Sequence, residues 1–284
     1  MAYEGKHLII IGGVAAGMKA AAKARRESPA MKITVVTDEE YISYAGCGMP
    51  YFIGDIINDS QKLLVREPPY FKNMHNIDVL TRHQAIAIDI KSKQVKVKNL
   101  EYGHDLVFNY AKLILATGAQ PVVPPLPGIS LGNIFTLRTI NDAIKIKSCV
   151  DSGKVKNAVI VGGGLIGLEM AENLVLRGIK VTVVELLDQI LPPLDKDMAL
   201  LVQHHLTEKG VGVITSDGVK SFEGNGGICI PQFSATILLI TSYTISISDC
   251  FSSSVVLFLL NRALCIGCQT AYFKPFFVAG HSAC

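Results

Sequence analysis

The fold is decided by the stretch Ala158-Val-Ile-Val-Gly-Gly-Gly-Leu-Ile-Gly-Leu-Glu169. Its apolar start predicts a strand, and a helix is predicted to follow from Leu168 to Leu176. Between them, three glycines match the pattern G-x-G-x-x-G, which arranges backbone N–H groups around a pyrophosphate at a helix start. The sequence therefore predicts a dinucleotide-binding α/β unit. Its candidate cofactor-binding residues are Gly162, Gly164, Leu165, Ile166 and Gly167.

An acidic residue follows this turn at the expected place. The next predicted strand runs from Lys180 to Val184 and ends at Glu185, 18 positions after Gly167. A carboxylate at the end of that strand can accept the ribose hydroxyls of NADH. No arginine or lysine occurs in residues 186–189, so a 2′-phosphate would meet repulsion without a partner. We therefore expect NADH to be preferred over NADPH.

A less regular copy of this pattern opens the chain. His7 to Ile11 is an apolar stretch that predicts a strand, and the segment Gly-Gly-Val-Ala-Ala-Gly leads into an alanine-rich helix reaching about Arg26. Val14 stands where the middle glycine is expected, so an ordinary glycine turn in an α/β unit is the alternative. The candidate cofactor-binding residues here are Gly12, Gly13, Val14, Ala15, Ala16 and Gly17.

Two groups of charged residues accompany this first copy. An acid is expected after the next strand, Ile33 to Val36, to hold a ribose hydroxyl. Asp38 is the nearest, and the acids at positions 39 and 40 are alternatives. One face of the helix carries three basic residues at helical spacing: Lys19, Lys23 and Arg26. Solvated charge is the ordinary interpretation of such a face, and a binding surface for an anionic substrate is the sharper one.

The chemistry is predicted in residues 43–51, Ser-Tyr-Ala-Gly-Cys-Gly-Met-Pro-Tyr. Cys47 lies between Gly46 and Gly48, which let the backbone approach a flat partner closely. Pro50 favours a helix that starts near Cys47, whose dipole would stabilise the reactive thiolate. A small buried cysteine in a glycine turn is the alternative. The flanking nucleotide patterns favour a redox role, with electrons passing from a nicotinamide through a flavin to sulfur.

The remaining patterns divide the chain. Alternating apolar residues from Ala85 to Tyr110 predict a small β-meander. Leu113 to Gly118 predicts a buried strand that runs into a turn, and the prolines between residues 121 and 127 exclude helix and mark a domain boundary. We expect an α/β fold with two Rossmann-like, three-layer domains. The predicted segments are the first domain with the meander insertion at 1–125, the second domain at 126–227, and an atypical apolar tail at 228–284.

Composition narrows the possible functions. The chain has 284 residues, 49% of them hydrophobic, and can bury sizeable cores. A net charge of +3, without an arginine-rich run, gives no reason to expect nucleic acid. The apolar run from Leu8 to Ile11 is too short for a signal peptide or membrane span, so we expect a cytoplasmic protein without membrane insertion. The uneven spread of the 7 cysteines argues against a secreted disulfide framework.

Five segments carry a family resemblance: residues 12–17, 43–51, 116–118 (Ala-Thr-Gly), 162–169 and 190–195 (Ile-Leu-Pro-Pro-Leu-Asp). Through them the chain resembles the pyridine nucleotide-disulfide oxidoreductases over about residues 5 to 224. It is most similar to the single-cysteine branch, which contains coenzyme A disulfide reductase, NADH oxidase, NADH peroxidase and persulfide reductase. The resemblance implies that the first glycine turn binds the FAD pyrophosphate, that the second binds NADH, and that the cysteine beside the flavin passes electrons to substrate.

The same resemblance assigns further residues. The implied cofactor contacts are Ser43, Thr117 and Gly118 for FAD and Glu169 near the nicotinamide, and the implied coenzyme A contacts are Lys19, Lys23, Arg26 and Ser43. Family members with two redox cysteines place the second one five residues after the first, where this chain has Phe52. Cys47 is then expected to cycle through a mixed disulfide, a persulfide or a sulfenic acid. Oxidases and peroxidases of the branch carry a histidine in the first turn, where this chain has Ala15.

These features predict an FAD-dependent oxidoreductase that passes electrons from NADH through FAD and Cys47 to a low-molecular-weight disulfide such as coenzyme A disulfide. The alternatives are an NADH oxidase, a persulfide reductase, or an inactive truncated nucleotide-binding remnant. The family resemblance also implies a homodimer.

The family pattern is lost from about Gly226. Residues 228–284 contain Asp249, Arg262 and Lys274 as their only Asp, Glu, Lys or Arg residues. We expect the second FAD segment and the dimerisation domain to be absent, and a tail unrelated to the family, such as a frameshifted coding end. A membrane anchor is disfavoured because the longest apolar run has six residues. The pair Cys265 and Cys268 lacks the second pair that a zinc site would need, so no metal is expected.

Overall fold

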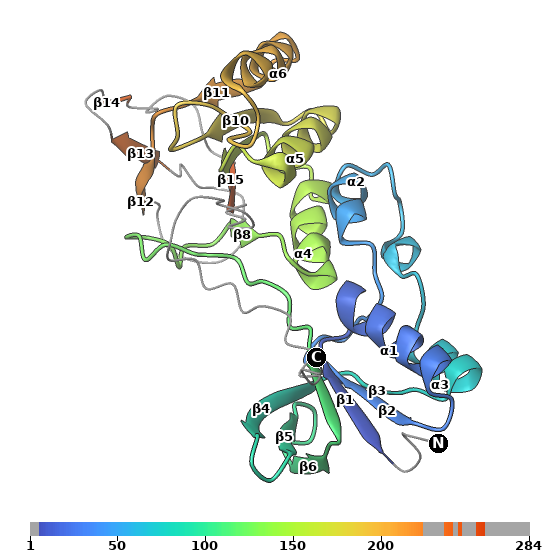
Figure 1. Cartoon of the computed structure of the whole chain (residues 1–284). Coiled ribbons are helices and arrows are strands. Elements are labelled where there is room, and N and C mark those ends of the chain that lie inside the picture. Colours follow the sequence, from blue (N-terminus) through green and yellow to red (C-terminus); the bar gives the residue numbers. More distant parts are fainter. Residues whose placement is uncertain (1–5, 224–235, 241–243, 246–253, 259–284) are drawn as a thin grey trace. The chain divides into compact units, whose positions relative to one another are not determined.

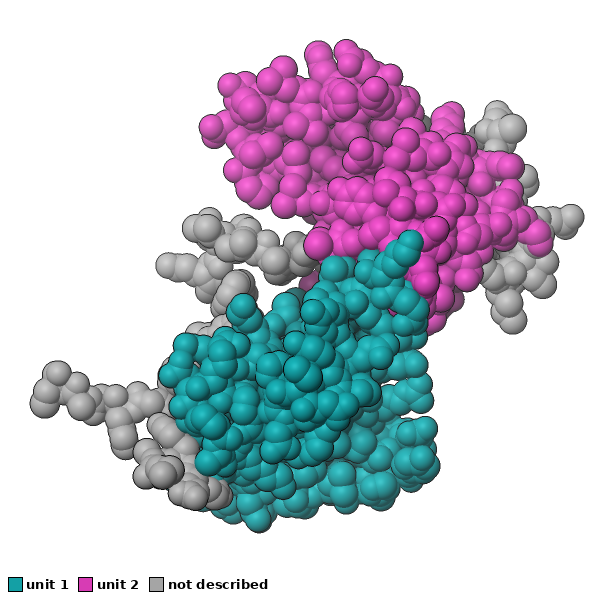
Figure 2. All heavy atoms as spheres, turned by 90° about the vertical axis from the view of Figure 1, so that its right-hand side faces the viewer, with its two compact units in different colours: residues 1–45, 61–119, 266–284 teal, residues 46–60, 120–265 magenta. Residues whose placement is uncertain are grey.

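The computed structural model describes residues 6–223, 236–240, 244–245 and 254–258 (Figure 1). The described residues form two compact units, shown in teal and magenta in Figure 2. Unit 1 takes residues 6–45 and 61–119, and unit 2 takes residues 46–60 together with the described residues from 120 onward. Within the described part, no helix combines the length and the apolar character needed to cross a membrane.

Unit 1 is built on a parallel sheet with strand order β3-β2-β1-β7. Its strands are β1 His7–Ile11, β2 Lys32–Val36, β3 Asp78–Leu80 and β7 Lys112–Leu115. The helices are α1 Ala15–Glu27, which follows β1, and α3 Pro68–His75, which precedes β3. Strands β1 and β2 are buried along almost their whole length, as a parallel sheet covered on both faces requires.

The two faces of this sheet have different covers. Ile10 belongs to a core with Met18 of α1, whereas Ile9 on the opposite face belongs to a core with Val95 and Val97. Those two valines lie in an antiparallel meander of β4 His83–Asp89, β5 Gln94–Asn99 and β6 Asp105–Asn109. Helices, sheet and meander make three layers, so the predicted three-layer domain with a meander insertion is confirmed.

Unit 2 is built on a parallel sheet with strand order β11-β10-β9-β15-β8. The strands are β8 Ile134–Thr136, β9 Asn157–Val161, β10 Lys180–Val184, β11 Gly212–Ile214 and β15 Ser254–Phe258. The helices are α4 Ile140–Asp151, α5 Leu165–Leu176 and α6 Lys196–Glu208. Helix α4 starts at a capping box, in which Thr139 and Asp142 each accept the other's backbone N–H.

The segment predicted as an atypical tail supplies backbone to unit 2. Strands β12 Val219–Glu223, β13 Thr236–Ile240 and β14 Thr244–Ile245 form an antiparallel sheet, and β15 lies between β9 and β8. The remaining positions of 228–284, including the pair Cys265 and Cys268, lie outside the described residues.

The chain passes between the units at two places. The compact units divide at Ala119 and Gln120, just before the proline-rich segment, and Leu126 already belongs to a core with Phe222 of β12. The second place is residues 46–60, which pack with unit 2 although the sequence assigned them to the first domain. This segment holds a 3-10 helix at Gly46–Gly48 and the short helix α2 Met49–Ile53, and it is followed by a 3-10 helix at Ser60–Leu63.

Candidate nucleotide and redox site

The first glycine turn is locked between β1, α1 and the end of β7. The N–H of Gly12 donates to the Val36 carbonyl over 2.8 Å. Gly12 has a φ of +112°, and a Cβ there would collide with the carbonyl oxygen of Ala116. A Cβ at Gly17 would collide with the carbonyl oxygen of Gly12. Close backbone approach therefore requires glycine at both ends of this turn, and it brings the Ala-Thr-Gly segment at 116–118 beside Gly12.

The middle of the first turn contacts the loop after β2. A Cβ at Gly13 would lie 2.8 Å from Thr37 Cγ2 and 2.9 Å from Ile42 Cγ2. The Gly13 carbonyl accepts the N–H of Ser43 over 3.0 Å, and Ser43 takes a left-handed φ of 48°. The structure thus brings the predicted Ser43 to the turn. The next residue, Val14, is the N-cap of α1, and Ala15 and Ala16 after it are exposed.

The second glycine turn is organised around a buried carboxylate. The Gly162 N–H donates to the Val184 carbonyl over 2.8 Å, and a Cβ at Gly167 would collide with the Gly162 carbonyl. The Glu185 side chain accepts the N–H of Gly163 over 2.7 Å and the N–H of Leu187 over 2.9 Å. Glu185 is only 9% exposed. A carboxylate has about four acceptor positions, so these two bonds leave acceptors for ribose hydroxyls.

Gly164 differs from the other glycines of this turn. It is the N-cap of α5, and a Cβ there would meet no atom within 4 Å. Protein packing therefore does not require glycine at this position, which leaves space at the start of the helix. Val14 holds the same place in the first turn, which explains how that turn folds without a middle glycine. At the exposed side of the second turn, Leu165 is solvent-accessible and Ile166 is half-buried.

The two turns repeat one set of contacts. Ile42 beneath Gly13 corresponds to Ile190, whose Cγ2 would lie 2.7 Å from a Cβ at Gly163. Ser43 corresponds to Leu191: both have a φ of 48°, and the Leu191 N–H donates to the Gly163 carbonyl over 2.8 Å. The repeat also shows that sequence analysis missed Gly163, although its counterpart Gly13 was among the candidates.

This repeat places Thr37, and not an acid, at the position that corresponds to Glu185. Both residues follow the last residue of their strand, because Val36 pairs with Ile11 as Val184 pairs with Val161. Thr37 is 5% exposed, and Asp38, one residue later, is exposed. Sequence analysis could have found this position by taking the first residue after the strand that pairs with β1. The ribose role of Asp38 remains a prediction.

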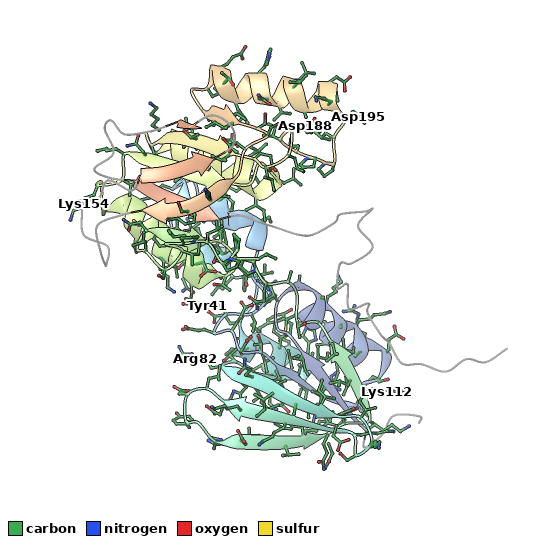
Figure 3. All side chains as sticks on the ribbon, turned by 90° about the vertical axis from the view of Figure 1, so that its left-hand side faces the viewer. Tyr41, Arg82, Lys112, Lys154, Asp188 and Asp195 are labelled. Atoms are coloured by element: carbon green, nitrogen blue, oxygen red, sulfur yellow. The ribbon has the colours of Figure 1, made fainter. Side chains whose placement is uncertain are left out.

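The two acids that were alternatives to Asp38 have partners. The hydroxyl of Tyr44 donates to the Glu39 carboxylate over 2.7 Å. Glu40 pairs with Arg82, labelled in Figure 3, over 2.9 Å, and Arg82 also lies 3.8 Å from Glu101. These contacts tie the loop after β2 to the start of the meander.

Cys47 is a free, exposed thiol within the 3-10 helix that precedes α2. Around it the chain is buried: Gly48, Met49 and Pro50 follow directly, and Phe52 and Ile53 are at most 5% exposed. The alternative of a cysteine buried in a glycine turn is therefore wrong. Helix α2 has five residues with proline in its first turn, as Pro50 predicted.

The remaining candidates lie on two helices. On α1, the side chains of Lys19, Lys23 and Arg26 are exposed, and Lys23 pairs with Glu27. The hydrogen bond from Lys23 lowers the pKa of the Glu27 carboxyl below its ordinary value.

On α5, Glu169 is half-buried and its carbonyl accepts the Asn173 side-chain N–H over 2.8 Å. The described residues contain no group of three His, Cys, Asp or Glu side chains that could hold a metal ion.

Comparisons with known proteins agree with this geometry. The NADH oxidase of Methanocaldococcus jannaschii is 39% identical over 217 residues, covering 76% of this chain and 48% of that protein. The coenzyme A disulfide reductase of Staphylococcus haemolyticus is 34% identical over 206 residues, covering 72% and 46%. The chain therefore spans about half the length of the curated relatives it matches.

Solved structures give the same result. The reduced CoADR-RHD of Bacillus anthracis superposes with a TM-score of 0.83 at 35% identity, covering 91% of this chain and 44% of that one. The NAD-dependent persulfide reductase from A. fulgidus superposes with a TM-score of 0.80 at 36% identity, covering 89% and 45%. The family model described as pyridine nucleotide-disulphide oxidoreductase matches residues 6–247, about twenty residues beyond the point where sequence reading loses the pattern. This chain belongs to the pyridine nucleotide-disulphide oxidoreductase family.

Proposed function

We propose that the chain is an FAD-dependent oxidoreductase that passes electrons from NADH to Cys47 and from there to a low-molecular-weight disulfide such as coenzyme A disulfide. The observation that carries the proposal is the exposed thiol of Cys47, in a chain whose two units each contain a glycine turn of the same construction. Relatives named coenzyme A disulfide reductase and persulfide reductase support the sulfur acceptor.

The residues present fit the two nucleotides. In unit 1, the turn from Gly12 to Gly17 would hold the FAD pyrophosphate, and Ser43, Thr117 and Gly118 would line the same site. In unit 2, the open space over Gly164 would receive the NADH pyrophosphate, and Glu185 would accept the ribose hydroxyls. Neutral residues follow Glu185 up to Asp188, which supports NADH over NADPH. FAD, when bound, would supply the chemistry of accepting a hydride and delivering an electron pair to sulfur.

The protein's own contribution is thiol-disulfide exchange at Cys47. The thiolate attacks one sulfur of the substrate disulfide, forms a new S–S bond with it and expels the other half as a thiolate. Two electrons and one proton then cleave the mixed disulfide, release the second thiol and restore the Cys47 thiolate. Cys47 is exposed, so a substrate disulfide can reach it from the solvent side. Lys19, Lys23, Arg26 and Ser43 are the proposed contacts of an anionic substrate such as coenzyme A.

The test is Cys47→Ser in the full chain. We expect NADH still to bleach the bound flavin, because hydride transfer does not use the thiol, and disulfide turnover to vanish. Cys149→Ser, which changes the half-buried cysteine on α4, is the matched control and should retain turnover. Turnover that survives Cys47→Ser would refute the assignment.

Three alternatives have distinct signatures. The relative named NADH oxidase supports oxygen as the acceptor, in which case NADH oxidation would consume oxygen and proceed without any disulfide. A nucleotide-binding remnant without enzymatic activity would purify without a flavin spectrum. A persulfide acceptor would react with the same thiol. An assay in which a persulfide and a disulfide compete for the enzyme would show which acceptor is preferred. The proposal includes a cytoplasmic location. A homodimer is implied by the family resemblance alone, and light scattering of the purified chain tests it.

A further inference from the structure

The segment that carries Cys47 is anchored in unit 2. We call residues 46–57 the redox segment, since the proposed function gives Cys47 the redox role. Its helix α2 buries Pro50, Phe52 and Ile53 and packs against α4 and α5, as Figure 1 also shows. Helix α5 is the helix whose N-terminus carries the second glycine turn. The same helix therefore contacts both the proposed NADH site and the redox segment.

Two cations bind the C-terminal end of this segment. Arg177, at the C-cap of α5, donates to the Ile53 carbonyl over 3.1 Å and pairs with Asp151 of α4 over 2.7 Å. The last carbonyls of a helix lack partners within that helix, so a guanidinium there satisfies one of them. Lys147 of α4 pairs with Asp55 over 2.8 Å and lies 3.4 Å from Asp151.

Burial distinguishes these cations from ordinary surface charges. The Lys147 side chain is 12% exposed and the Arg177 side chain 22% exposed, and the Lys147 ammonium lies 5.4 Å from the Phe52 ring centroid. Only the cations are withdrawn from solvent, because the Asp55 side chain is 55% exposed and the Asp151 side chain 44% exposed. The ammonium near an aromatic ring gains further attraction. The hydrogen bond from Lys147 also lowers the pKa of the Asp55 carboxyl.

Beside the two cations, the redox segment packs closely against α5. A Cβ at Gly54 would collide with the side-chain oxygen of Asn173 on α5, and Asn173 is fully buried. Among the described residues, that oxygen has no hydrogen-bond partner. Glycine at position 54 therefore allows the redox segment to approach α5 closely at Asn173.

We propose that Lys147 and Arg177 are positioning residues that hold the redox segment against α4 and α5, so that Cys47 keeps one orientation for thiol-disulfide exchange. The inference rests on the proposed function for the role of Cys47. In the described part of the chain, the hydrogen bonds and ion pairs of Lys147 and Arg177 go to Ile53, Asp55 and Asp151, and not to Cys47 or a nucleotide turn. Their effect acts through the backbone at Ile53 and the carboxylates of Asp55 and Asp151.

Hydrogen exchange tests the anchoring without reference to activity. In the full chain, the N–H groups of Gly54, Ile56 and Ile57 donate within the segment, to Pro50 and Tyr51 carbonyls. Arg177→Ala and Lys147→Met should each speed exchange of a peptide covering residues 46–57 by about tenfold, the effect expected for one charged hydrogen bond. The matched control is Lys96→Met, which breaks the Lys96–Asp105 pair of the meander and should leave this peptide unchanged.

Kinetics test the consequence for Cys47. Both variants should lower kcat with the disulfide by about tenfold, while the KM for NADH and the rate of flavin reduction stay within about twofold, because the glycine turns are intact. Arg177→Lys, which keeps the charge, should recover part of kcat. Exchange rates equal to those of the wild type in both variants would overturn the proposal. If the wild type reduces flavin without turning over any disulfide, the proposed function fails, and the exchange experiment still decides the anchoring.

Discussion

The buried carboxylate of Glu185 allows an isosteric test of how the second glycine turn is held. Both of its oxygens accept backbone N–H groups, from Gly163 at 2.7 Å and Leu187 at 2.9 Å. Glu185→Gln keeps the shape but replaces one acceptor oxygen by an NH₂ group, which faces an N–H that it cannot bind. One buried donor then lacks a partner, and such a group costs about 1–3 kcal/mol. We expect the free energy of unfolding to fall by about that amount.

Urea unfolding followed by far-UV circular dichroism suits this measurement, since the chain has no tryptophan to report unfolding. The control is Asp188→Asn, three residues after Glu185. It removes a solvent-exposed ion pair with Lys196 and should leave the urea midpoint unchanged. NADH affinity, measured by titration, should fall in Glu185→Gln and stay unchanged in the control. If Glu185→Gln unfolds at the wild-type urea midpoint with an unchanged slope, the two hydrogen bonds contribute nothing net and the reasoning is refuted.

Three further predictions concern the pH dependence of stability, a closely packed glycine and the open glycine. Burial, followed by the nearby Lys32, lowers the pKa of His7 below its ordinary value of 6.5, so the folded chain favours the neutral ring. Stability should be complete above about pH 6.5 and fall as pH drops through the folded pKa. His7→Gln should remove that part of the slope in urea midpoints measured against pH, and equal slopes would contradict the prediction. Gly167→Ala should destabilise the fold by about 1–3 kcal/mol through overpacking. Gly164→Ala should keep the thermal midpoint yet weaken NADH binding, and a lowered midpoint for Gly164→Ala would show that the space there is not open.

Local patterns predicted most of the two nucleotide turns. The strands β1, β2, β9 and β10 and the helices after the turns appear close to the predicted places, because apolar runs and glycine spacing are determined within about thirty residues of chain. Helix α5 begins at Leu165, three residues before the predicted start, since the glycine turn leads directly into it. The meander is confirmed by the antiparallel pairing of β4, β5 and β6, and the predicted alternation is clearest in β5, where Val95 and Val97 are buried.

Non-local features could not be predicted in this way. Asp38 was preferred by counting along the chain, whereas the pairing of Val36 with Ile11 determines that Thr37 corresponds to Glu185. Strand β15 joins the unit 2 sheet between β9 and β8, a position that no periodicity in residues 254–258 indicates. Lys147 and Arg177 resemble solvated charges in the sequence, and only the packing of α2 shows what they bind.

Because the glycine turn is repeated, a substitution in the turn of one unit can serve as the control for the same substitution in the other. A Cβ at Gly13 would lie 2.8 Å from Thr37 and 2.9 Å from Ile42, and a Cβ at Gly163 would lie 2.7 Å from Ile190, so the two substitutions should disturb their scaffolds through contacts of similar length. A difference between the two substitutions would then report the ligand that each unit receives and not the scaffold around it.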